Sequence, residues 1–471
     1  MQQGSRLVTL GVMLSIVLAA MESTVVATAM PTVVKSLGGL DIYSWVFSAF
    51  LLTSTVTMPL WGRVSDLLGR RRPYLVGLVI FLVGSALSGV SGSMGQLVVF
   101  RAIQGLGAGC LMPIGMTIIA DLYGLERRAK MQGYFSSMWG GASLVGPLVG
   151  GFLSDHVSWR WAFYINVPFG LAAIALIAYG LRGDALPARR PRIDLLGLML
   201  FTAGVSALLI GLVRAGQSAS GGDLAVLGPI LVAAALLIAF LMVERRVAEP
   251  IIPLGLFRMA IVRAATANGF LSGMAMFGAI AFVPLFMQDV TGASATAAGF
   301  VLTPFVLGWV LFSIVSARLL LRTGYRKLVI AGMLCLAMAF VLFSTWDAGL
   351  TRPAAMGAVL IAGAGMGLTF VPLLIAVQSA VGLTERGAVT SLTQFFRTIG
   401  GTVGVSVMGA VMAYRLQSGA DTQTALHGVF VVGLVVSLGA LLSAFLVPAG
   451  SAQELARASS SSMTTPSEAG R

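Results

Sequence analysis

Long apolar runs, separated by short polar segments, follow one another along almost the whole chain. We distinguish fourteen such runs, and each is long enough to cross a bilayer, because a helix of about 20 residues spans the hydrocarbon core. The spans lie at 7–34, 43–61, 74–92, 97–120, 131–153, 161–180, 195–213, 224–243, 261–288, 294–320, 328–344, 354–381, 388–413 and 428–447. This pattern predicts an all-α polytopic membrane protein with 14 transmembrane helices.

The composition supports this class and explains the excess of basic residues. Hydrophobic residues make up 57% of the chain and charged residues only 10%, which excludes a water-soluble fold of 471 residues. If the amino terminus is cytoplasmic, 23 of the 30 Lys and Arg lie in the inner loops and tails, so the positive-inside rule favours both termini in the cytoplasm. The net charge of +13 therefore indicates contact with anionic membrane lipids and no nucleic-acid partner.

Glu22 is the only acidic residue in the middle of the first predicted span. At about 1.5 Å per residue it lies roughly 20 Å from each end of the span, near the bilayer centre. A carboxylate there costs on the order of 3 kcal/mol, and such residues usually mark the path of an ion or substrate. Because burial in hydrocarbon disfavours the charged form, Glu22 is a candidate for proton binding and release; a hydrogen-bonded structural acid is the alternative.

A weak internal repeat indicates two related halves. Aligning Gly69, in the loop after the second span, with Gly324, in the loop after the tenth, also brings Arg63 onto Arg318. Six-helix halves related in this way are typical of secondary transporters whose site lies between the halves. The predicted domains are a six-helix bundle at 1–182, a linker with two inserted helices at 183–250, a second six-helix bundle at 251–448 and a disordered cytoplasmic tail at 449–471.

Four motifs resemble those of a known family. Residues 62–71 look like the G-x-x-x-D-x-x-G-R-R loop of the major facilitator superfamily, and residues 101–109 are similar to the R-x-x-Q-G motif of its fourth helix. Residues 142–151 resemble the antiporter motif of the fifth helix, with Ala142 in place of the leading Gly. Residues 159–168, WRWAFYINVP, look like the signature of the fourteen-helix drug:proton antiporter family. The resemblance covers the chain except its tail and implies a multidrug efflux transporter with the major facilitator fold.

The resemblance assigns the loop at 62–71 to a latch between the halves that opens as the protein changes state. The candidate latch residues are Gly62, Asp66, Gly69, Arg70 and Asp121. The two glycines allow a tight turn, Asp66 can face a helix N-terminus, and Arg70 can reach Asp121 at the end of the fourth helix. The alternative is a static cytoplasmic anchor that obeys the positive-inside rule.

Two further motifs imply roles in antiport. By resemblance, Arg101 helps to set the protonation of Glu22; alternatively, its long side chain snorkels to the nearby end of the helix. The antiporter motif contributes Gly146, Pro147, Gly150 and Gly151. Glycines and a proline at this spacing predict close contact with another helix and a bend, although ordinary small-residue packing would explain the same residues.

Apolar and aromatic side chains are expected to line the substrate cavity, with amides as polar contacts. The candidate substrate residues are Trp45, Gln104, Trp139, Asn166, Phe277, Gln288, Gln378, Gln394 and Arg397. Arg397 lies about eleven residues into its span, too deep for easy snorkelling, so it needs a partner such as backbone carbonyls or Gln378. A structural role and a substrate role are both open. The tenth span carries no acid, which disfavours substrates with two positive charges.

The sequence gives no support to other energy sources or to catalysis. None of the three lysines directly follows a glycine, as a Walker motif requires, and two histidines are too few for a metal site. We therefore predict no enzyme, metal or cofactor, and a monomeric antiporter in a bacterial-type cytoplasmic (inner) membrane. The proton gradient would drive export of lipophilic small molecules, cationic drugs included, by alternating access. A proton-coupled uptake symporter, a dedicated metabolite or lipid exporter, and a non-transporting receptor or scaffold are the alternatives.

Overall fold

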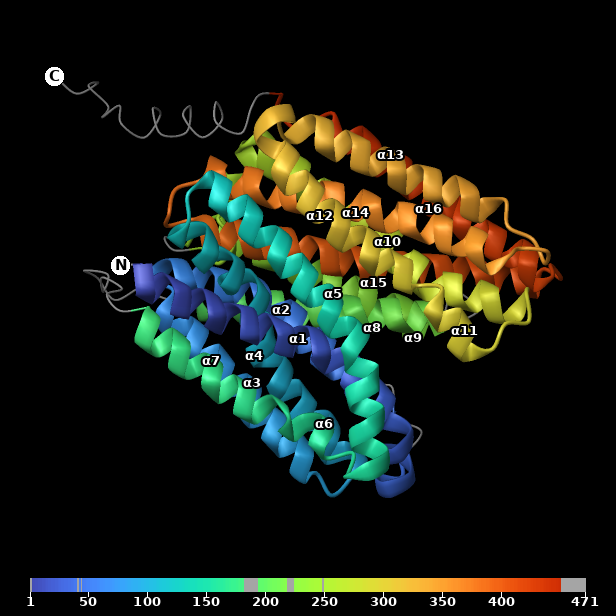
Figure 1. The fold of residues 1–471 in the computed structure, drawn as a ribbon, viewed down its shortest axis with the longest axis horizontal. Helices are drawn as coiled ribbons and strands as arrows, with labels where there is room; N and C mark the ends of the chain where they lie inside the picture. Colours follow the sequence, from blue (N-terminus) through green and yellow to red (C-terminus); the bar gives the residue numbers. More distant parts are fainter. Residues whose placement is uncertain are drawn as a thin grey trace.

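The computed structural model describes residues 2–39, 42–43, 45–181, 194–217, 224–247 and 250–449, which fold almost entirely into helices (Figure 1). The first half of the chain contains α1 (Gln2–Leu37), α2 (Trp45–Leu68), α3 (Arg71–Val90), α4 (Met94–Leu122), α5 (Leu125–His156), α6 (Trp161–Tyr164) and α7 (Asn166–Gly180). The second half contains η2 (Leu254–Arg258), α10 (Ala260–Asp289), α11 (Ala295–Phe300), α12 (Thr303–Thr323), α13 (Tyr325–Ser344), α14 (Arg352–Ala380), α15 (Arg386–Gln417) and α16 (Thr422–Ala444). Between them lie α8 (Leu195–Gln217) and α9 (Leu224–Glu244).

The apolar runs become helices because a helix satisfies every interior backbone N–H and C=O group without water. Twelve stretches in the described ranges are long and apolar enough to cross a membrane; α6 with α7, and α11 with α12, each form one of them. The helices α5 and α8, also predicted to cross, fall outside this set. Helix α5 is less apolar than its neighbours, and the described apolar part of α8 spans only Leu196–Leu212.

The aligned glycines of the two halves end equivalent helices. Gly69 follows α2 with φ of 82°, and Gly324 follows α12 with φ of 77°. Both values lie in the left-handed region, which glycine adopts without a steric penalty, so the expected turn at Gly69 is confirmed. Gly62 has a different place from the one expected, because it lies inside α2 rather than in a turn.

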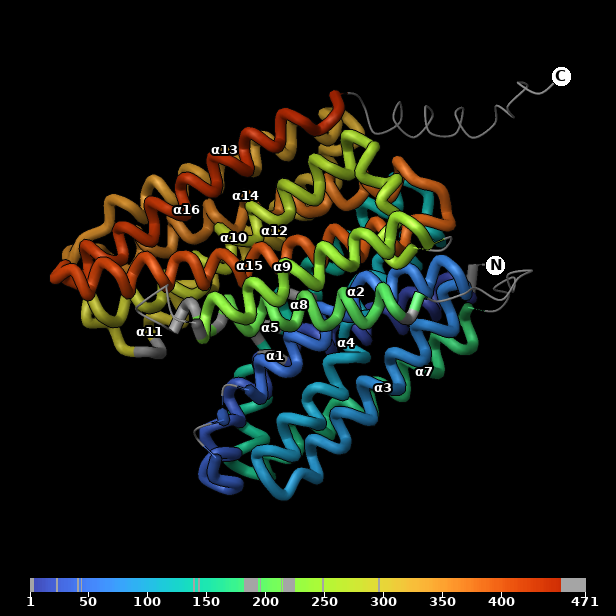
Figure 2. The backbone as a smooth tube through the Cα atoms, turned by 180° about the vertical axis from the view of Figure 1, so that it is seen from behind, coloured from blue at the N-terminus to red at the C-terminus, as the bar shows by residue number. Residues whose placement is uncertain are grey.

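The two halves meet along two helix pairs. Helix α2 packs against α15, and α5 packs against α12, which are corresponding pairs under the internal repeat. Figures 1 and 2 show the halves diverging from this contact towards the ends that carry α6 and α11. The inserted helices pack on each other, and α8 also contacts α2 and α15. Phe201 of α8 lies between Phe240 and Phe395, with ring centroids 5.1 and 5.4 Å away.

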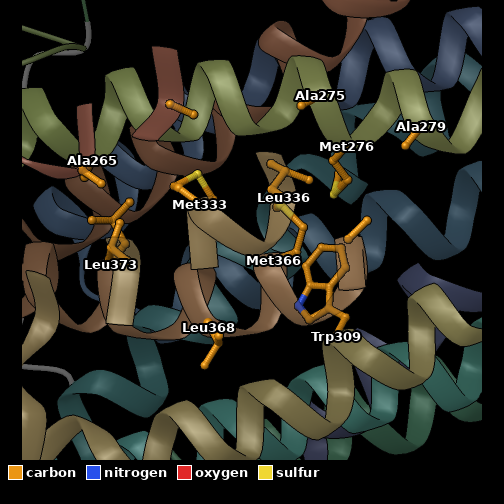
Figure 3. Close-up of a cluster of buried hydrophobic side chains, with 14 of the residues drawn as sticks. Ala265, Ala275, Met276, Ala279, Trp309, Met333, Leu336, Met366, Leu368 and Leu373 are labelled. Carbon is orange, nitrogen blue, oxygen red and sulfur yellow. The ribbon is translucent and has the colours of Figure 1, made fainter. Parts of the chain in front are cut away.

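Apolar packing differs between the halves. In the second half, one continuous cluster joins α10, α12, α13 and α14, and Figure 3 shows part of it around Trp309, Met333 and Met366. The first half has two clusters, one containing Val8 to Leu18 of α1 and one containing Val25 to Val33 of the same helix. Glu22 lies between them. The predicted linker at 183–193 and the predicted tail from 450 onward lie outside the described residues.

Candidate functional site: a buried carboxylate and a contact between the halves

Glu22 is held by side chains from two other helices of the first half. It lies in the middle of α1 and is 1% exposed. One carboxylate oxygen forms an ion pair with Nη1 of Arg101 from α4. The other accepts a hydrogen bond from Nδ2 of Asn166, at the start of α7, over 2.5 Å. The packing of α1, α4 and α7 therefore brings together the acid and the base that sequence reasoning could relate only by family resemblance.

Arg101 points into the bundle, so the alternative in which it snorkels to the helix end is wrong. Its side chain is 1% exposed, and Nη1 also donates to Oε1 of Gln104 over 2.7 Å. The guanidinium carbon lies 4.2 Å from the centre of the Phe50 ring, a cation–π contact that offsets part of the cost of burial. Nε donates to the carbonyl of Val46 over 3.3 Å. These contacts fix the base beside the acid.

We call Glu22, Arg101, Gln104 and Asn166 the Glu22 cluster. This cluster forms a polar layer between the two apolar clusters of the first half. A small cavity of about 20 Å³ adjoins the carboxylate. Its lining residues are Leu18, Met21, Glu22, Val25, Ala162, Ile165, Asn166 and Phe169. This volume is enough for a water molecule. The cluster therefore combines a buried acid, a basic partner and room for water.

A second polar cluster joins the two halves at the ends of α2, α4 and α15. Asp66 of α2 accepts hydrogen bonds from the backbone N–H groups of Gly387 (2.9 Å) and Ala388 (2.7 Å), in the first turn of α15. The amino terminus of a helix binds an anion through unpaired N–H groups and the helix dipole. Arg70 forms an ion pair with Asp66 and a second one, over 2.9 Å, with Asp121 at the end of α4. The contacts that the sequence suggested for Asp66 and Arg70 are therefore present.

Two neighbouring carboxylates favour the charged form of Arg70. Burial disfavours the charged form, but the carboxylates of Asp66 and Asp121 outweigh burial and raise the pKa of Arg70 above its usual value. Arg70 also donates from Nη2 to the carbonyl of Leu383 in the second half over 2.5 Å. The guanidinium thus connects α2, α4 and the segment before α15.

Two basic residues of this contact were not among the predicted site residues. Arg386 donates to Oδ1 of Asp121 over 3.0 Å, so Asp121 bridges a base from each half. Arg128 of α5 donates to Ser379 of α14 over 3.3 Å and to the carbonyl of Ala120 over 2.7 Å. A sequence signal existed for Arg386, because it is a lone base at the edge of an apolar span on the same predicted side as the 62–71 loop.

Gly62 lies where the backbones of α2 and α15 approach each other closely. A Cβ atom on Gly62 would lie 2.0 Å from Oγ of Ser391 and 2.6 Å from the carbonyl oxygen of Gly387. Neither distance is possible for a real side chain, so α2 and α15 can cross this closely only with glycine at the crossing. Gly62 therefore supports the contact between the halves through helix packing.

The antiporter motif has two glycines that face α1 and two residues that do not. A Cβ on Gly146 would lie 1.9 Å from Oγ1 of Thr24, and one on Gly150 would lie 2.1 Å from Oγ1 of Thr28. Gly151 has open space around its position, and Pro147 is exposed. The expected close helix contact is therefore present, but only Gly146 and Gly150 make it.

The candidate substrate residues do not form one cluster. Gln104 and Asn166 belong to the Glu22 cluster. Gln394 of α15 contacts the other half, with Nε2 at 3.2 Å from Sδ of Met116. Three candidates are exposed, and the side chain of a fourth lies outside the described residues. The exposed residues are Trp45, Phe277 and Gln288, and the fourth is Trp139.

Arg397 has aromatic neighbours in place of the partner expected from the sequence. Its guanidinium carbon lies 4.3 Å from the centre of the Phe370 ring and 5.9 Å from that of Trp309. Gln378, the suggested partner, donates instead to Oγ1 of Thr390 over 3.1 Å. Of the two partners suggested from the sequence, backbone carbonyls or Gln378, the second is therefore wrong.

Comparison with known proteins identifies the family. The profile of the Major Facilitator Superfamily matches residues 12–405. The chain belongs to this superfamily. It is 39% identical over 414 residues to the multidrug transporter protein MdtP of Bacillus subtilis (strain 168), covering 88% of this chain and 76% of that protein. It is 36% identical over 410 residues to multidrug resistance protein 3 of the same organism, covering 87% and 80% of the two chains.

Solved structures of this superfamily share the fold. The human organic anion transporter MFSD10 (TETRAN) superimposes with a TM-score of 0.68 at 17% identity, covering 94% of this chain and 99% of that one. The proton:xylose symporter XylE superimposes with a TM-score of 0.66 at 14% identity, covering 97% and 99%. At these identities the similarity concerns the fold alone. The family profile and the bacterial relatives show that the chain is a multi-pass membrane transporter of a superfamily whose members are not enzymes.

Proposed function

We propose that this facilitator is a proton-coupled antiporter that exports lipophilic small molecules, as a member of the fourteen-helix drug:proton antiporter family. The observation that carries the proposal is the cluster of Glu22, Arg101 and Asn166. It places a buried carboxylate next to a fixed base and a water-sized cavity, in the middle of a membrane helix. An acid in this setting is suited to exchange protons, and the two named bacterial multidrug relatives support a drug as the cargo.

The contact between the halves supports alternating access. The latch residues are Gly62, Asp66, Gly69, Arg70 and Asp121, which close the end of the bundle where α2 and α4 finish and α15 begins. If the amino terminus is cytoplasmic, this end faces the cytoplasm and the diverging ends face outward. In this state Glu22 takes up a proton from outside, and opening of the latch then exposes the cargo site to the cytoplasm and the inner leaflet.

The topology completes the proposal. Helices α5 and α8 cross the bilayer with the twelve apolar stretches, both termini are cytoplasmic, and the protein works as a monomer in a bacterial cytoplasmic (inner) membrane. The basic residues concentrated in the inner loops support this orientation. No cofactor is required, because the pH gradient supplies the energy.

Flux in proteoliposomes with an imposed pH gradient tests the function. We expect drug movement against proton movement for the wild type, its loss in Glu22→Gln, and partial retention in Glu22→Asp, which keeps a carboxylate on a shorter arm. Asp155→Asn is the matched control, because Asp155 is an exposed acid at the end of α5. Movement of drug and proton in the same direction would establish symport, and full pH-driven export by Glu22→Gln would refute the role of Glu22.

Removing the charge of Glu22 leaves Arg101 buried without its ion pair, which can destabilise the fold by several kcal/mol. The double variant Glu22→Gln with Arg101→Gln removes both charges and serves as a folding control. Drug binding without a pH gradient, measured by thermal shift, then separates loss of coupling from loss of folding. A variant that binds drug but no longer couples it to protons is the expected result.

A further inference from the structure

Arg397 is an isolated charge deep in the second half. It lies eleven residues after the start of α15, or about 16 Å along the helix axis, close to mid-membrane depth. Its backbone is fixed, because a Cβ on Gly273 of α10 would lie 2.2 Å from the Arg397 carbonyl oxygen. In the described part of the chain, its buried Nη1 has no hydrogen-bond acceptor and no ion pair includes Arg397.

The second half has no acid that could compensate this charge. The four acidic residues between 251 and 449 are Asp289, Asp347, Glu385 and Asp421. Asp289 is the last residue of α10, Asp347 lies between α13 and α14, and Glu385 and Asp421 precede α15 and α16. All four therefore lie at helix ends. A buried cation without a partner is costly, whereas Arg101 in the first half has Glu22 as its counter-charge.

A small cavity adjoins Arg397. A cavity of about 20 Å³ lies between α10, α14 and α15. Its lining residues are Asn268, Gly269, Ser272, Met366, Thr369, Phe370, Leu373, Thr393 and Arg397. The hydroxyl groups of Ser272, Thr369 and Thr393 donate to carbonyls of their own helices. The Asn268 amide donates to Ala440 and Ser443, which leaves its Oδ1 as a buried acceptor without a partner in the described part of the chain. Among the residues that line the cavity, Arg397 supplies the positive charge.

Apolar side chains lie beside the cavity, and α15 contacts the other half one turn away from Arg397. Trp309 and Met366, which lie close together in Figure 3, and Phe370 provide flat and flexible apolar contacts. Gln394, one turn before Arg397 on α15, contacts Met116 of the first half. A ligand that reaches Arg397 from between the halves would thus place its apolar body against these side chains.

We propose that Arg397 binds the anionic group of the exported compound, so that amphipathic organic monoanions such as aromatic carboxylates are preferred cargo. This inference rests on the proposed export function and names its substrate class. The guanidinium supplies directed donors that match a carboxylate, and Phe370 and Trp309 hold the ring system attached to it. The Glu22 carboxylate is occupied by Arg101 and does not offer a cationic drug a comparable site in this state.

Equilibrium binding to the purified full-length protein tests the preference without a proton gradient. The probes are 1-naphthaleneacetate, its uncharged amide and 1-naphthylmethylamine, which share one aromatic body and differ in charge. For the wild type we expect the acetate to bind at least tenfold more tightly than the amide, and the amine to bind most weakly. Arg397→Gln should remove the difference between acetate and amide, and Arg397→Lys should keep part of it.

Arg415→Gln is the matched control, because Arg415 is an exposed base on the same helix. It should bind like the wild type. A second arm titrates chloride into the buffer and uses sucrose to keep the osmolarity constant. If chloride alone stabilises the wild type against heating, and Arg397→Gln abolishes this stabilisation, then the occupant is an inorganic anion and the cargo assignment is overturned. An equal or stronger affinity for the amine, or an unchanged acetate preference in Arg397→Gln, would overturn it as well.

The two proposals fail in distinguishable ways. If pH-driven flux is absent but Arg397-dependent acetate binding persists, antiport is wrong and the anion site stands. If the wild type exchanges neutral and cationic drugs for protons but shows no preference for the acetate, antiport stands and the anion site is wrong. Size-exclusion profiles and thermal midpoints of Arg397→Gln and Arg397→Lys report whether each variant is folded.

Discussion

Asp66 accepts the backbone N–H of Ala388 over 2.7 Å, across the boundary between the two halves of the chain. Asp66 lies near the end of α2 in the first half, and Ala388 lies in the first turn of α15 in the second half. Asp66 contributes a charged acceptor to this contact, whereas α15 contributes backbone N–H groups and needs no particular side chain. It therefore depends on the position of the α15 amino terminus, so we expect it to break if the halves separate at this end.

Replacing Asp66 by Asn should shift the protein towards the state in which this end is open. Hydrogen bonds to a charged group contribute roughly 1.5–3 kcal/mol each, and about 1.4 kcal/mol is tenfold in an equilibrium, so we expect a population shift of roughly tenfold or more. Spin labels at Lys130 and Arg322, exposed residues near this end of α5 and α12, report the distance between the halves. Asp66→Asn should increase the fraction at longer distance.

Glu385→Gln is the control for this experiment. Glu385 lies at the same amino terminus of α15 but makes no capping hydrogen bond, so its replacement should leave the distances unchanged. Asp121→Asn should increase the fraction at longer distance less than Asp66→Asn does. Asp121 and Arg386 are partly exposed, and such ion pairs contribute about 1 kcal/mol or less. An unchanged distance distribution in Asp66→Asn would show that the contact does not hold the halves together.

The raised pKa of Arg70 predicts how this contact responds to alkaline pH. A base with a raised pKa contributes its full stabilisation below its usual pKa and loses it only as the pH rises through the higher folded value. The contact should therefore persist between pH 7 and about pH 10, which lies below the ordinary pKa of arginine. The same spin-label pair should give equal distances at both values. Opening of this end within that range would contradict the assignment of the charge to Arg70.

The helices were predictable because their cause is local. In a chain of this composition the backbone has few ways to satisfy its polar groups, so the position of each apolar run determines the position of a helix. The turn at Gly69 was predictable for the same reason, since the repeat with Gly324 placed two glycines at equivalent helix ends. Gly62 was misplaced because a glycine that permits a turn and a glycine that permits a helix crossing look identical in sequence.

The site was less predictable because its contacts depend on how helices are rotated and tilted. Glu22 was identifiable from the cost of an acid at the bilayer centre. The hydrogen bond from Asn166 to Glu22 was not predicted, because Asn166 was listed only as a candidate substrate residue. Arg397 was recognised as needing a partner, yet no property of the sequence could reveal that aromatic rings surround it. These contacts join helices that are far apart in the chain. No local pattern in a single sequence shows which side chains of such helices meet.

Asn166 should hold the Glu22 carboxylate in position for exchange. Its amide donates to Glu22 Oε2, and a hydrogen bond to a charged group contributes roughly 1.5–3 kcal/mol. Asn166→Ala removes this bond, so we expect drug-dependent proton release to fall by roughly tenfold, given about 1.4 kcal/mol per factor of ten. Ser85→Ala removes the other acceptor of the same amide and should lower proton release less. Unchanged proton release in Asn166→Ala would contradict the proposed interaction.

Gly150 and Gly151 offer a matched pair of substitutions on adjacent positions of α5. A Cβ at position 150 would lie 2.1 Å from Oγ1 of Thr28 and 2.7 Å from the Val25 carbonyl oxygen, whereas position 151 has no neighbouring atom within 4 Å. Overpacking of this kind costs about 1–3 kcal/mol, so Gly150→Ala should lower the thermal midpoint measurably and reduce flux. Gly151→Ala should be neutral or slightly stabilising, because alanine favours the helix.

A third variant determines which atom opposes the added methyl group. Thr28→Ala removes the hydroxyl but leaves the Val25 carbonyl, which belongs to the backbone of α1 and cannot rotate away. In the Gly150→Ala background it should therefore restore only part of the lost stability. Complete rescue would mean that α1 and α5 separate easily at this level. Equal thermal midpoints for Gly150→Ala and Gly151→Ala would show that the motif glycines are not required for the α1–α5 contact.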